Sequence, residues 1–260
     1  MRVHHLNCAT MRPPITPSMV AHVLLVERAD GLFLVDTGFG TGDIANPKRL
    51  GKPFQLMVRP ALDPGETAVA QVKALGFSAD DVTDIALTHL DLDHAGGIAD
   101  FPKARIHVHQ PELDAAMHPT MREKARYVGA QWAHGPSWVA HSEAGDNWFG
   151  FSSVTALGDD VVLIPLIGHT RGHAGVAVRD AEGHWLLHAG DSFFDAQQVQ
   201  TPAGCNRGLA AFQTLMAVSN KQRRANTELL RELVASHSAE VTVFCAHDKS
   251  QYDALAHTAG

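Results

Sequence analysis

The sequence predicts an α/β fold in which strands and helices occur in two successive sets. Short, continuous apolar runs of strand length alternate with longer amphipathic runs of helix length. In addition, His or Asp residues directly follow several of the apolar runs, in both halves of the chain. Because buried strands are typically continuous apolar stretches, these features predict two similar halves whose strand ends meet at one site.

The first half is expected to begin with a hairpin. Residues 20–27 and 31–36 are two strands around the turn Asp30-Gly31. A helix is expected at 64–76, because Pro64 and Glu66 fall in its first turn and apolar residues then recur on one face. The other expected elements of this half are two strands and an amphipathic helix, at 84–88, 105–109 and 111–130.

The second half follows a similar pattern of strands and helices. Its expected elements, in order, are strands near 160–166, 174–179 and 184–190, helices at 208–218 and 221–236, and a strand that ends at His247. No linker or low-complexity segment divides the chain, so residues 1–260 are expected to form a single domain.

The segment 131–152, between the halves, predicts no regular structure. Three of the four tryptophans lie in it. Such a concentration of aromatic residues is consistent with an aromatic wall over a site or with a dimer contact. It is equally consistent with a loop pinned by its own aromatic side chains, so these interpretations stay open.

Composition narrows the class of protein. A chain of 260 residues with 45% hydrophobic content can bury a sizeable core. The net charge is −7 without a basic stripe, which disfavours nucleic acid as a partner. No apolar run approaches the length of a membrane span, and the N-terminus lacks an apolar signal core. Three widely spaced cysteines form no disulfide framework, so a reducing cytoplasm is the expected compartment.

The most informative run is residues 88–97, Thr-His-Leu-Asp-Leu-Asp-His-Ala-Gly-Gly. Four potential metal ligands fall within it: His89, Asp91, Asp93 and His94. In a strand-like register, residues 89, 91 and 93 share one side. Burying so much polarity without partners is costly, so a bound metal explains the run better than a solvated Asp-rich turn with two incidental histidines.

Three further ligand-type residues follow apolar strands. They are His169 after 164–168, Asp191 after 185–190 and His247 after 241–246. A lone histidine after a strand is usually a core or loop residue. Together with the 88–97 run, however, these three indicate a metal centre built from both halves of the chain.

With the early run Leu34-Val35-Asp36-Thr37-Gly38, these motifs resemble the metallo-β-lactamase superfamily, and most closely its N-acyl-homoserine lactone lactonase branch. The resemblance covers nearly the whole chain and implies a four-layer αββα sandwich with a dinuclear metal site at one edge. It implies His89, Asp91 and His169 as ligands of the first metal, Asp93, His94 and His247 as ligands of the second, and Asp191 as the bridge.

The same resemblance implies a hydrolase that opens a lactone or cleaves a carboxylic ester by attack of a metal-bridging hydroxide. Asp93 and Asp191 would be its catalytic residues, positioning the nucleophile and moving its proton. The substrate would be a small molecule, and the resemblance alone suggests a homodimer. Other superfamily hydrolases, such as a thioesterase or phosphodiesterase, and a low-turnover binding protein that keeps the metal site, remain alternatives.

Two departures from the family pattern concern the metal site and the pocket. The usual motif has a second His where this chain has Asp91, and an oxygen ligand makes Mn or Fe more competitive with Zn, which is still favoured. The extra carboxylate would make the dinuclear centre about neutral rather than +1, which favours neutral esters or lactones over anionic substrates. Phe194 stands where lactonases carry a Tyr, and it cannot donate a hydrogen bond to a substrate carbonyl.

Two residues near the motifs have open roles. Asp36 ends the second strand of the hairpin, where it either contacts a metal ligand or caps the turn. His173 lies in a Gly-rich turn, and a supporting contact to the site is the alternative to a purely local role.

Overall fold

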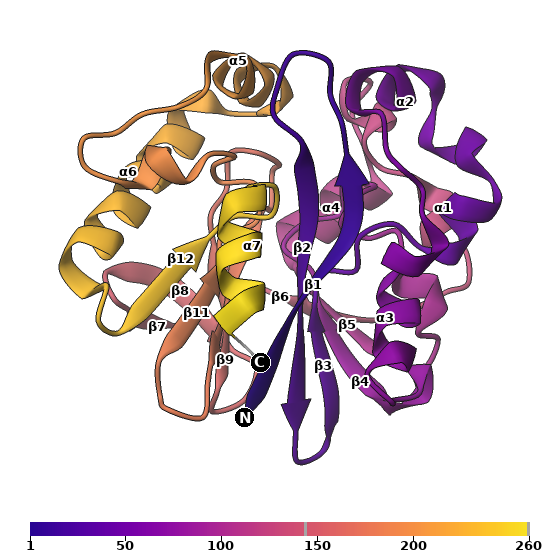
Figure 1. The fold of residues 1–260 in the computed structure, drawn as a ribbon, viewed down its shortest axis with the longest axis horizontal. Coiled ribbons are helices and arrows are strands. Elements are labelled where there is room, and N and C mark those ends of the chain that lie inside the picture. The colour runs from indigo at the N-terminus through magenta and orange to yellow at the C-terminus, as the bar shows by residue number, and fades with distance from the viewer. Residues whose placement is uncertain (143–144, 259–260) are drawn as a thin grey trace.

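The computed structural model describes residues 1–142 and 145–258. Two six-stranded sheets pack face to face, and helices cover the outer face of each (Figure 1). The strand orders are β1-β2-β3-β4-β5-β6 and β12-β11-β10-β9-β8-β7. This four-layer αββα arrangement confirms the predicted fold class.

The first sheet combines an antiparallel meander with parallel strands. Its strands are β1 (Arg2–Met11), β2 (Met19–Arg28), β3 (Gly31–Val35), β4 (Val82–Ala86), β5 (Arg105–His109) and β6 (Ser137–His141). The predicted hairpin is β2 and β3, whereas β1 was not predicted. From β3 to β6 the strands are parallel, so their C-terminal ends lie at the same edge of the sheet.

The second sheet is antiparallel except for its last pair. Its strands are β7 (Asp146–Trp148), β8 (Phe151–Ala156), β9 (Val161–Pro165), β10 (Ala174–Arg179), β11 (Trp185–His188) and β12 (Val241–Phe244). Strands β11 and β12 are parallel, which places the residues after them side by side.

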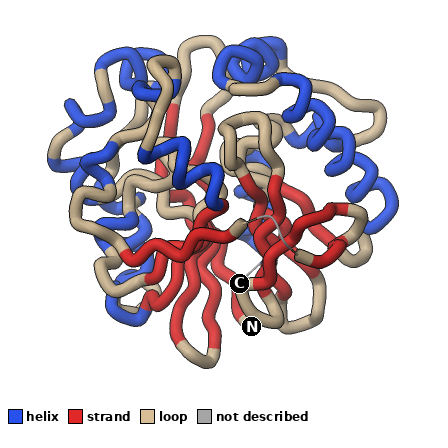
Figure 2. The backbone as a smooth tube through the Cα atoms, turned by 180° about the vertical axis from the view of Figure 1, so that it is seen from behind, coloured by secondary structure: helices blue, strands red, loops and turns tan. Residues whose placement is uncertain are grey.

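The described helices lie mainly on the two flanks of the molecule (Figures 1 and 2). They are α1 (Thr41–Ala45), α2 (Lys52–Val58), α3 (Ala68–Ala74), α4 (Gln110–Met117), α5 (Arg207–Met216), α6 (Asn220–His237) and α7 (Lys249–Thr258). Short 3-10 turns occur at Pro47–Leu50, Pro64–Glu66, Ala79–Asp81, Ile98–Asp100, Glu123–Ala125, Gly129–Gln131 and Ala196–Val199. Every helix in the described part of the chain is too short or too polar to cross a bilayer.

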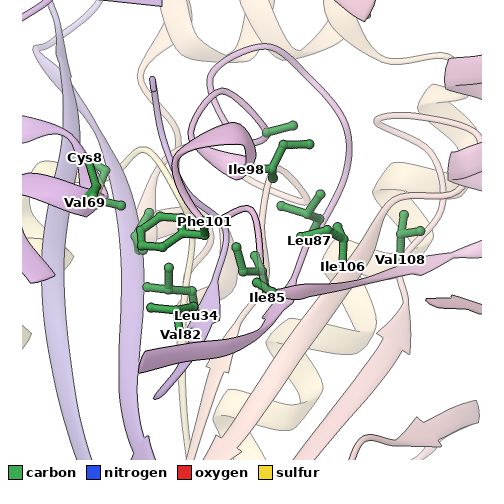
Figure 3. Packing of buried hydrophobic residues seen from close by; sticks show 14 of the residues in the cluster. Cys8, Leu34, Val69, Val82, Ile85, Leu87, Ile98, Phe101, Ile106 and Val108 are labelled. Atoms are coloured by element: carbon green, nitrogen blue, oxygen red, sulfur yellow. The ribbon is translucent and has the colours of Figure 1, made fainter. Parts of the chain in front are cut away.

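The core has one apolar layer between the sheets and one under each helical flank. Phe33 from the first sheet and Phe244 from the second both belong to the central layer. Helices α3 and α4 cover the first sheet, where Leu34, Val82 and Phe101 gather on its outer face (Figure 3). Helix α6 covers the second sheet through its apolar stripe. These layers hold the strand ends in place.

The expected helix at 111–130 is wrong in its length. Helix α4 ends at Met117, because His118 precedes Pro119 and a residue before proline disfavours helical backbone. The chain then continues through the 3-10 turns Glu123–Ala125 and Gly129–Gln131. This break brings the 122–126 segment over the site described below.

The expectation of irregular structure at 131–152 is also wrong in part. Strand β6 adds to β5 in parallel, and β7 pairs with β8, so neighbouring strands impose regular structure on a segment with weak local preference. Residues 143–144 lie outside the described part. Trp148 packs against Trp185, with ring centroids 5.6 Å apart, and Phe149 packs on His237. This cluster belongs to the second sheet and its helix.

Candidate metal centre

The candidate metal ligands lie at one edge of the two sheets. The 89–94 run follows β4, His169 follows β9, Asp191 follows β11 and His247 follows β12. Gly190 permits the turn before Asp191, because its φ is +53° and a Cβ there would lie 2.5 Å from Nε2 of His173. The sheet topology therefore brings together the residues predicted from separate motifs.

The Asp191 carboxylate lies between two groups of histidines. Its Oδ2 is 3.7 Å from Nε2 of His89 and 3.3 Å from Nε2 of His169. Its Oδ1 is 3.4 Å from Nε2 of His94 and 3.1 Å from Nε2 of His247. The two oxygens thus face different groups, as a bridging carboxylate would.

The remaining two carboxylates belong to one group each. Asp91 Oδ2 is 3.5 Å from Nε2 of His89 and 3.1 Å from Nε2 of His169. Asp93 lies on the other side, with its carboxylate oxygens 4.0 Å from Nε2 of His94 and 3.7 Å from Nε2 of His247. We call these residues the first group (His89, Asp91, His169) and the second group (Asp93, His94, His247).

The donor atoms of both groups suit a divalent metal. Nε2 of His89 and Nε2 of His94 are buried and have no hydrogen-bond partner among the described residues. Buried polar atoms are rarely left in this state unless a water or ion satisfies them. In each group, the imidazole nitrogens and carboxylate oxygens lie within 4.8 Å of one another, so each group could hold one ion.

The far side of the histidine rings is held in an orientation that leaves Nε2 free. His94 Nδ1 lies 2.9 Å from Oδ2 of Asp36, and His247 Nδ1 lies 2.8 Å from the carbonyl oxygen of Val20. When Nδ1 carries the proton and donates it to these acceptors, Nε2 presents a lone pair toward the site.

Asp36 contacts a candidate ligand, which decides between the two interpretations left open by the sequence. It has a left-handed φ of +60° and also accepts hydrogen bonds from the backbone N–H and hydroxyl of Thr88, at 2.7 and 2.8 Å. Burial opposes its ionisation, but His94 lowers the pKa of Asp36 to about 2. Asp36 is therefore a carboxylate that orients His94.

His173 supports Asp191 from behind. Its Nδ1 lies 3.0 Å from the carbonyl oxygen of Leu166, and its Nε2 accepts the backbone N–H of Asp191 at 2.8 Å. Burial, followed by the neighbouring His89, keeps the pKa of His173 well below its usual value. A neutral ring can accept this hydrogen bond, so His173 sets the direction of the Asp191 turn.

Glu112 was not predicted as part of the site. Its fully buried carboxylate accepts the backbone N–H of Leu90 at 2.9 Å and that of Gly172 at 3.1 Å, together with the hydroxyls of Tyr127 and Thr170. It therefore ties the loop that carries the first histidine motif to the loop that carries His169. Only the folded chain brings these four donors together.

The surrounding carboxylates make the second group attractive to cations. Burial alone would lower the pKa of His94, but Asp191 and Asp36 raise it to about 10. A metal ion would displace that proton, because a histidine must be deprotonated to ligate. Burial lowers the pKa of His169 to about 4, with Asp191 opposing and Arg126 acting in the same direction. The ring of His169 is thus neutral near pH 7.

Arg126 corrects the charge predicted for the site. Its Nε and Nη2 donate to Oδ1 and Oδ2 of Asp91, both at 2.7 Å, in a bidentate pair. This buried guanidinium adds one positive charge, so the formal charge that Asp91 was expected to remove is restored. Arg126 therefore offsets the charge on which the expected preference for neutral substrates rested, and that preference stays a prediction. No spacing in the sequence pointed to Arg126 as the partner of Asp91.

A cavity of about 240 Å³ opens beside these groups. Asp91, Asp93 and Asp191 line its polar end, and its walls are largely apolar, with Met11, Phe54, Met57, Phe194, Phe212 and Leu215 among the lining residues. Phe194 packs on His247, with ring centroids 4.9 Å apart. None of the aromatic residues at 132, 138, 148, 149 and 151 lines the described cavity. Of the interpretations left open for this segment, an aromatic wall is therefore not what the structure shows at this cavity, and a dimer contact stays untested.

Comparison with known proteins agrees with this geometry. The family model described as the metallo-beta-lactamase superfamily matches residues 18–237, which include six of the seven candidate ligands, all except His247. The chain belongs to the metallo-β-lactamase superfamily. It is thus a metallo-hydrolase by family.

Curated relatives and solved structures similar to this chain are also described as hydrolases or lactonases. A probable metallo-hydrolase of Mycobacterium tuberculosis is 44% identical over 263 residues, covering all of this chain and 84% of that protein. The N-acyl homoserine lactonase AttM of Rhizobium johnstonii is 28% identical over 164 residues, covering 63% of this chain and 61% of AttM. A structure of an N-acyl homoserine lactone hydrolase with N-hexanoyl-L-homoserine bound at its catalytic metal centre has a TM-score of 0.76 at 19% identity, with 97% and 95% of the two chains covered.

Proposed function

We propose that this superfamily member opens a lactone, or cleaves a carboxylic ester, that carries an apolar tail. One observation carries the proposal: five of the seven candidate ligands, namely Asp91, Asp93, His169, Asp191 and His247, line a cavity whose other walls are largely apolar. A ligand site with a few converging polar groups and an apolar wall suits a molecule with one reactive group and an apolar body. The similarity to lactone hydrolases supports the same substrate class.

The seven residues would hold two divalent ions, with zinc favoured and manganese or iron as alternatives. His89, Asp91 and His169 would hold one ion, Asp93, His94 and His247 the other, and Asp191 would contact both. Bound metals supply a nucleophile from water near neutral pH and polarise a carbonyl oxygen.

The chain itself would supply orientation and proton transfer. Asp93 lines the cavity and is the most exposed of the three site carboxylates, at 13% for its side chain. Its carboxylate would accept the proton of the attacking water and return it to the leaving alkoxide. Asp191 is held by His173 and would keep the two groups at their separation. The apolar walls would exclude water from the substrate tail.

The test is proton release by metal-loaded protein from lactones of graded ring size and tail length, with linear esters alongside. We expect turnover of lactones and its loss, by a factor of at least about 10³, in Asp191→Asn. Asp159→Asn, at an exposed bend between β8 and β9, is the matched control and should keep full activity. Hydrolysis of a thioester or phosphodiester, without lactone turnover, would redirect the proposal to another hydrolase of the superfamily. Metal-loaded protein inactive on every class would favour a binding protein.

A further inference from the structure

The two groups of candidate ligands differ in their contact with Arg126. Both oxygens of Asp91, in the first group, already accept hydrogen bonds from this guanidinium. Its Nη2 also lies 2.9 Å from Nε2 of His169, a second member of that group. An imidazole nitrogen has one lone pair, so it cannot fully serve an N–H donor and a metal ion at once.

Arg126 is fixed in this position by the backbone. Its Nη1 donates to the carbonyl oxygens of His169 at 3.1 Å and Met216 at 3.3 Å. Its side chain is only 9% exposed, and a guanidinium stays protonated in proteins. The guanidinium is therefore a permanent, anchored positive charge beside the first group.

The second group has no comparable cation. Within the described residues, Asp93 pairs with His94 and His247 and with no arginine or lysine. Nε2 of His94 is free of hydrogen bonds there. In the described part of the chain, the ion-pair partners of the carboxylates around the second group are thus histidines alone.

We propose that Arg126 makes the two groups unequal, so that the second group binds its ion tightly and the first binds its ion much more weakly. This rests on the metal binding in the proposed function. The physical reasons are repulsion between the guanidinium and a divalent ion in a site of low dielectric, and competition for the donor atoms of Asp91 and His169. Arg126 is thereby a positioning residue that sets the affinity of the first group.

The test is calorimetric titration of metal-free protein with Mn²⁺ or Zn²⁺, with bound metal counted after dialysis. Wild type should bind one ion per chain tightly and a second at least about tenfold more weakly. Arg126→Met should bind two ions tightly, because the competing donor and charge are gone. Arg122→Met is the matched control, since Arg122 lines the same cavity but bonds to the carbonyl oxygens of Leu215 and Ala217. It should keep the wild-type pattern.

A second variant keeps the test decisive if the single variant folds poorly. Arg126→Met leaves the buried Asp91 carboxylate without its partner in metal-free protein, which is destabilising. Asp91→His/Arg126→Met removes both charges and should also bind two ions tightly. Two equally tight ions in wild type, or loss of an ion in both variants, would overturn the inference. A wild type that binds no ion overturns the proposed function as well, whereas unequal sites without lactone turnover overturn only the substrate assignment.

Discussion

At the scale of single residues, the candidate ligands depend on neighbours that the motifs do not contain. Asp36 holds His94 and the backbone of Thr88, and His173 holds the backbone of Asp191. The candidate ligands could be identified from the sequence because four of the seven lie in one short run and the other three each follow an apolar strand. The contact between Arg126 and Asp91 could not be predicted, because 35 residues separate the two and no local sequence pattern indicates that they pair.

Asp36→Asn should weaken metal binding by about 10- to 100-fold, because the orienting carboxylate of a ligand histidine contributes on this scale. Competition with a coloured chelator measures the change. The matched control is Asp43→Asn, a buried carboxylate that pairs with Arg49 and Gln131 and contacts none of the candidate ligands. Equal weakening in both variants would mean that general destabilisation, rather than the contact to His94, causes the effect.

At the scale of elements, much of the cavity wall comes from segments whose secondary structure the sequence patterns did not predict correctly. Helix α2 contributes Phe54, Met57 and Val58, although no helix was predicted before residue 64. The break at Pro119 brings Arg122 and Arg126 to the cavity, where a continuous helix was expected. Helix α5 was predicted at nearly its observed place, because its apolar period is clear, but the period does not show which residues face a cavity.

Phe212→Ala tests whether α5 forms the tail-binding wall. Phe212 lines the cavity and packs near Phe194, with ring centroids 5.7 Å apart. We expect the KM of long-tailed substrates to rise about tenfold, from lost apolar contact, and that of short-tailed substrates to change little. Steady-state kinetics across the tail series measures this. Phe149→Ala, in the aromatic cluster outside the cavity, is the control. A tail-independent effect in Phe212→Ala would exclude α5 as the wall.

At the scale of the whole molecule, the two sheets meet at a cluster of neutral histidines. His5 and His22 of the first sheet share a 2.7 Å hydrogen bond, and the ring of His22 packs on Phe244 of the second at 4.6 Å. Burial, helped by His188 and His4, lowers the pKa of His5 to about 4. Protonation of these buried histidines would destabilise the folded state, so the stability of the packing between the two sheets should depend on pH.

The free energy of unfolding should fall as pH drops from about 6.5 toward 4. Between these pH values His5 is protonated in the unfolded chain but not in the folded protein. The contribution of neutral His5 to the free energy of unfolding is therefore fully present above pH 6.5 and is lost on acidification. Each such histidine contributes up to about 1.4 kcal/mol per pH unit. Urea unfolding of metal-free protein measures the slope. It should be shallower in His5→Gln and unchanged in His134→Gln, an exposed histidine. Equal slopes in wild type and His5→Gln would contradict the assignment.

The sequence by itself determined the superfamily, the fold class and the seven candidate ligands. These features depend on strand hydrophobicity, on the short spacing in 88–97 and on turn residues. Each of these involves residues close together in the sequence, so it can be identified without the tertiary structure. Their assignment as metal ligands stays a prediction, as does the extent of a single domain over 1–260. The tertiary structure alone decided that Arg126 faces Asp91, that Glu112 joins two loops and that the aromatic cluster lies away from the cavity. These contacts join residues far apart in the chain, and only the packing of both sheets brings them within reach.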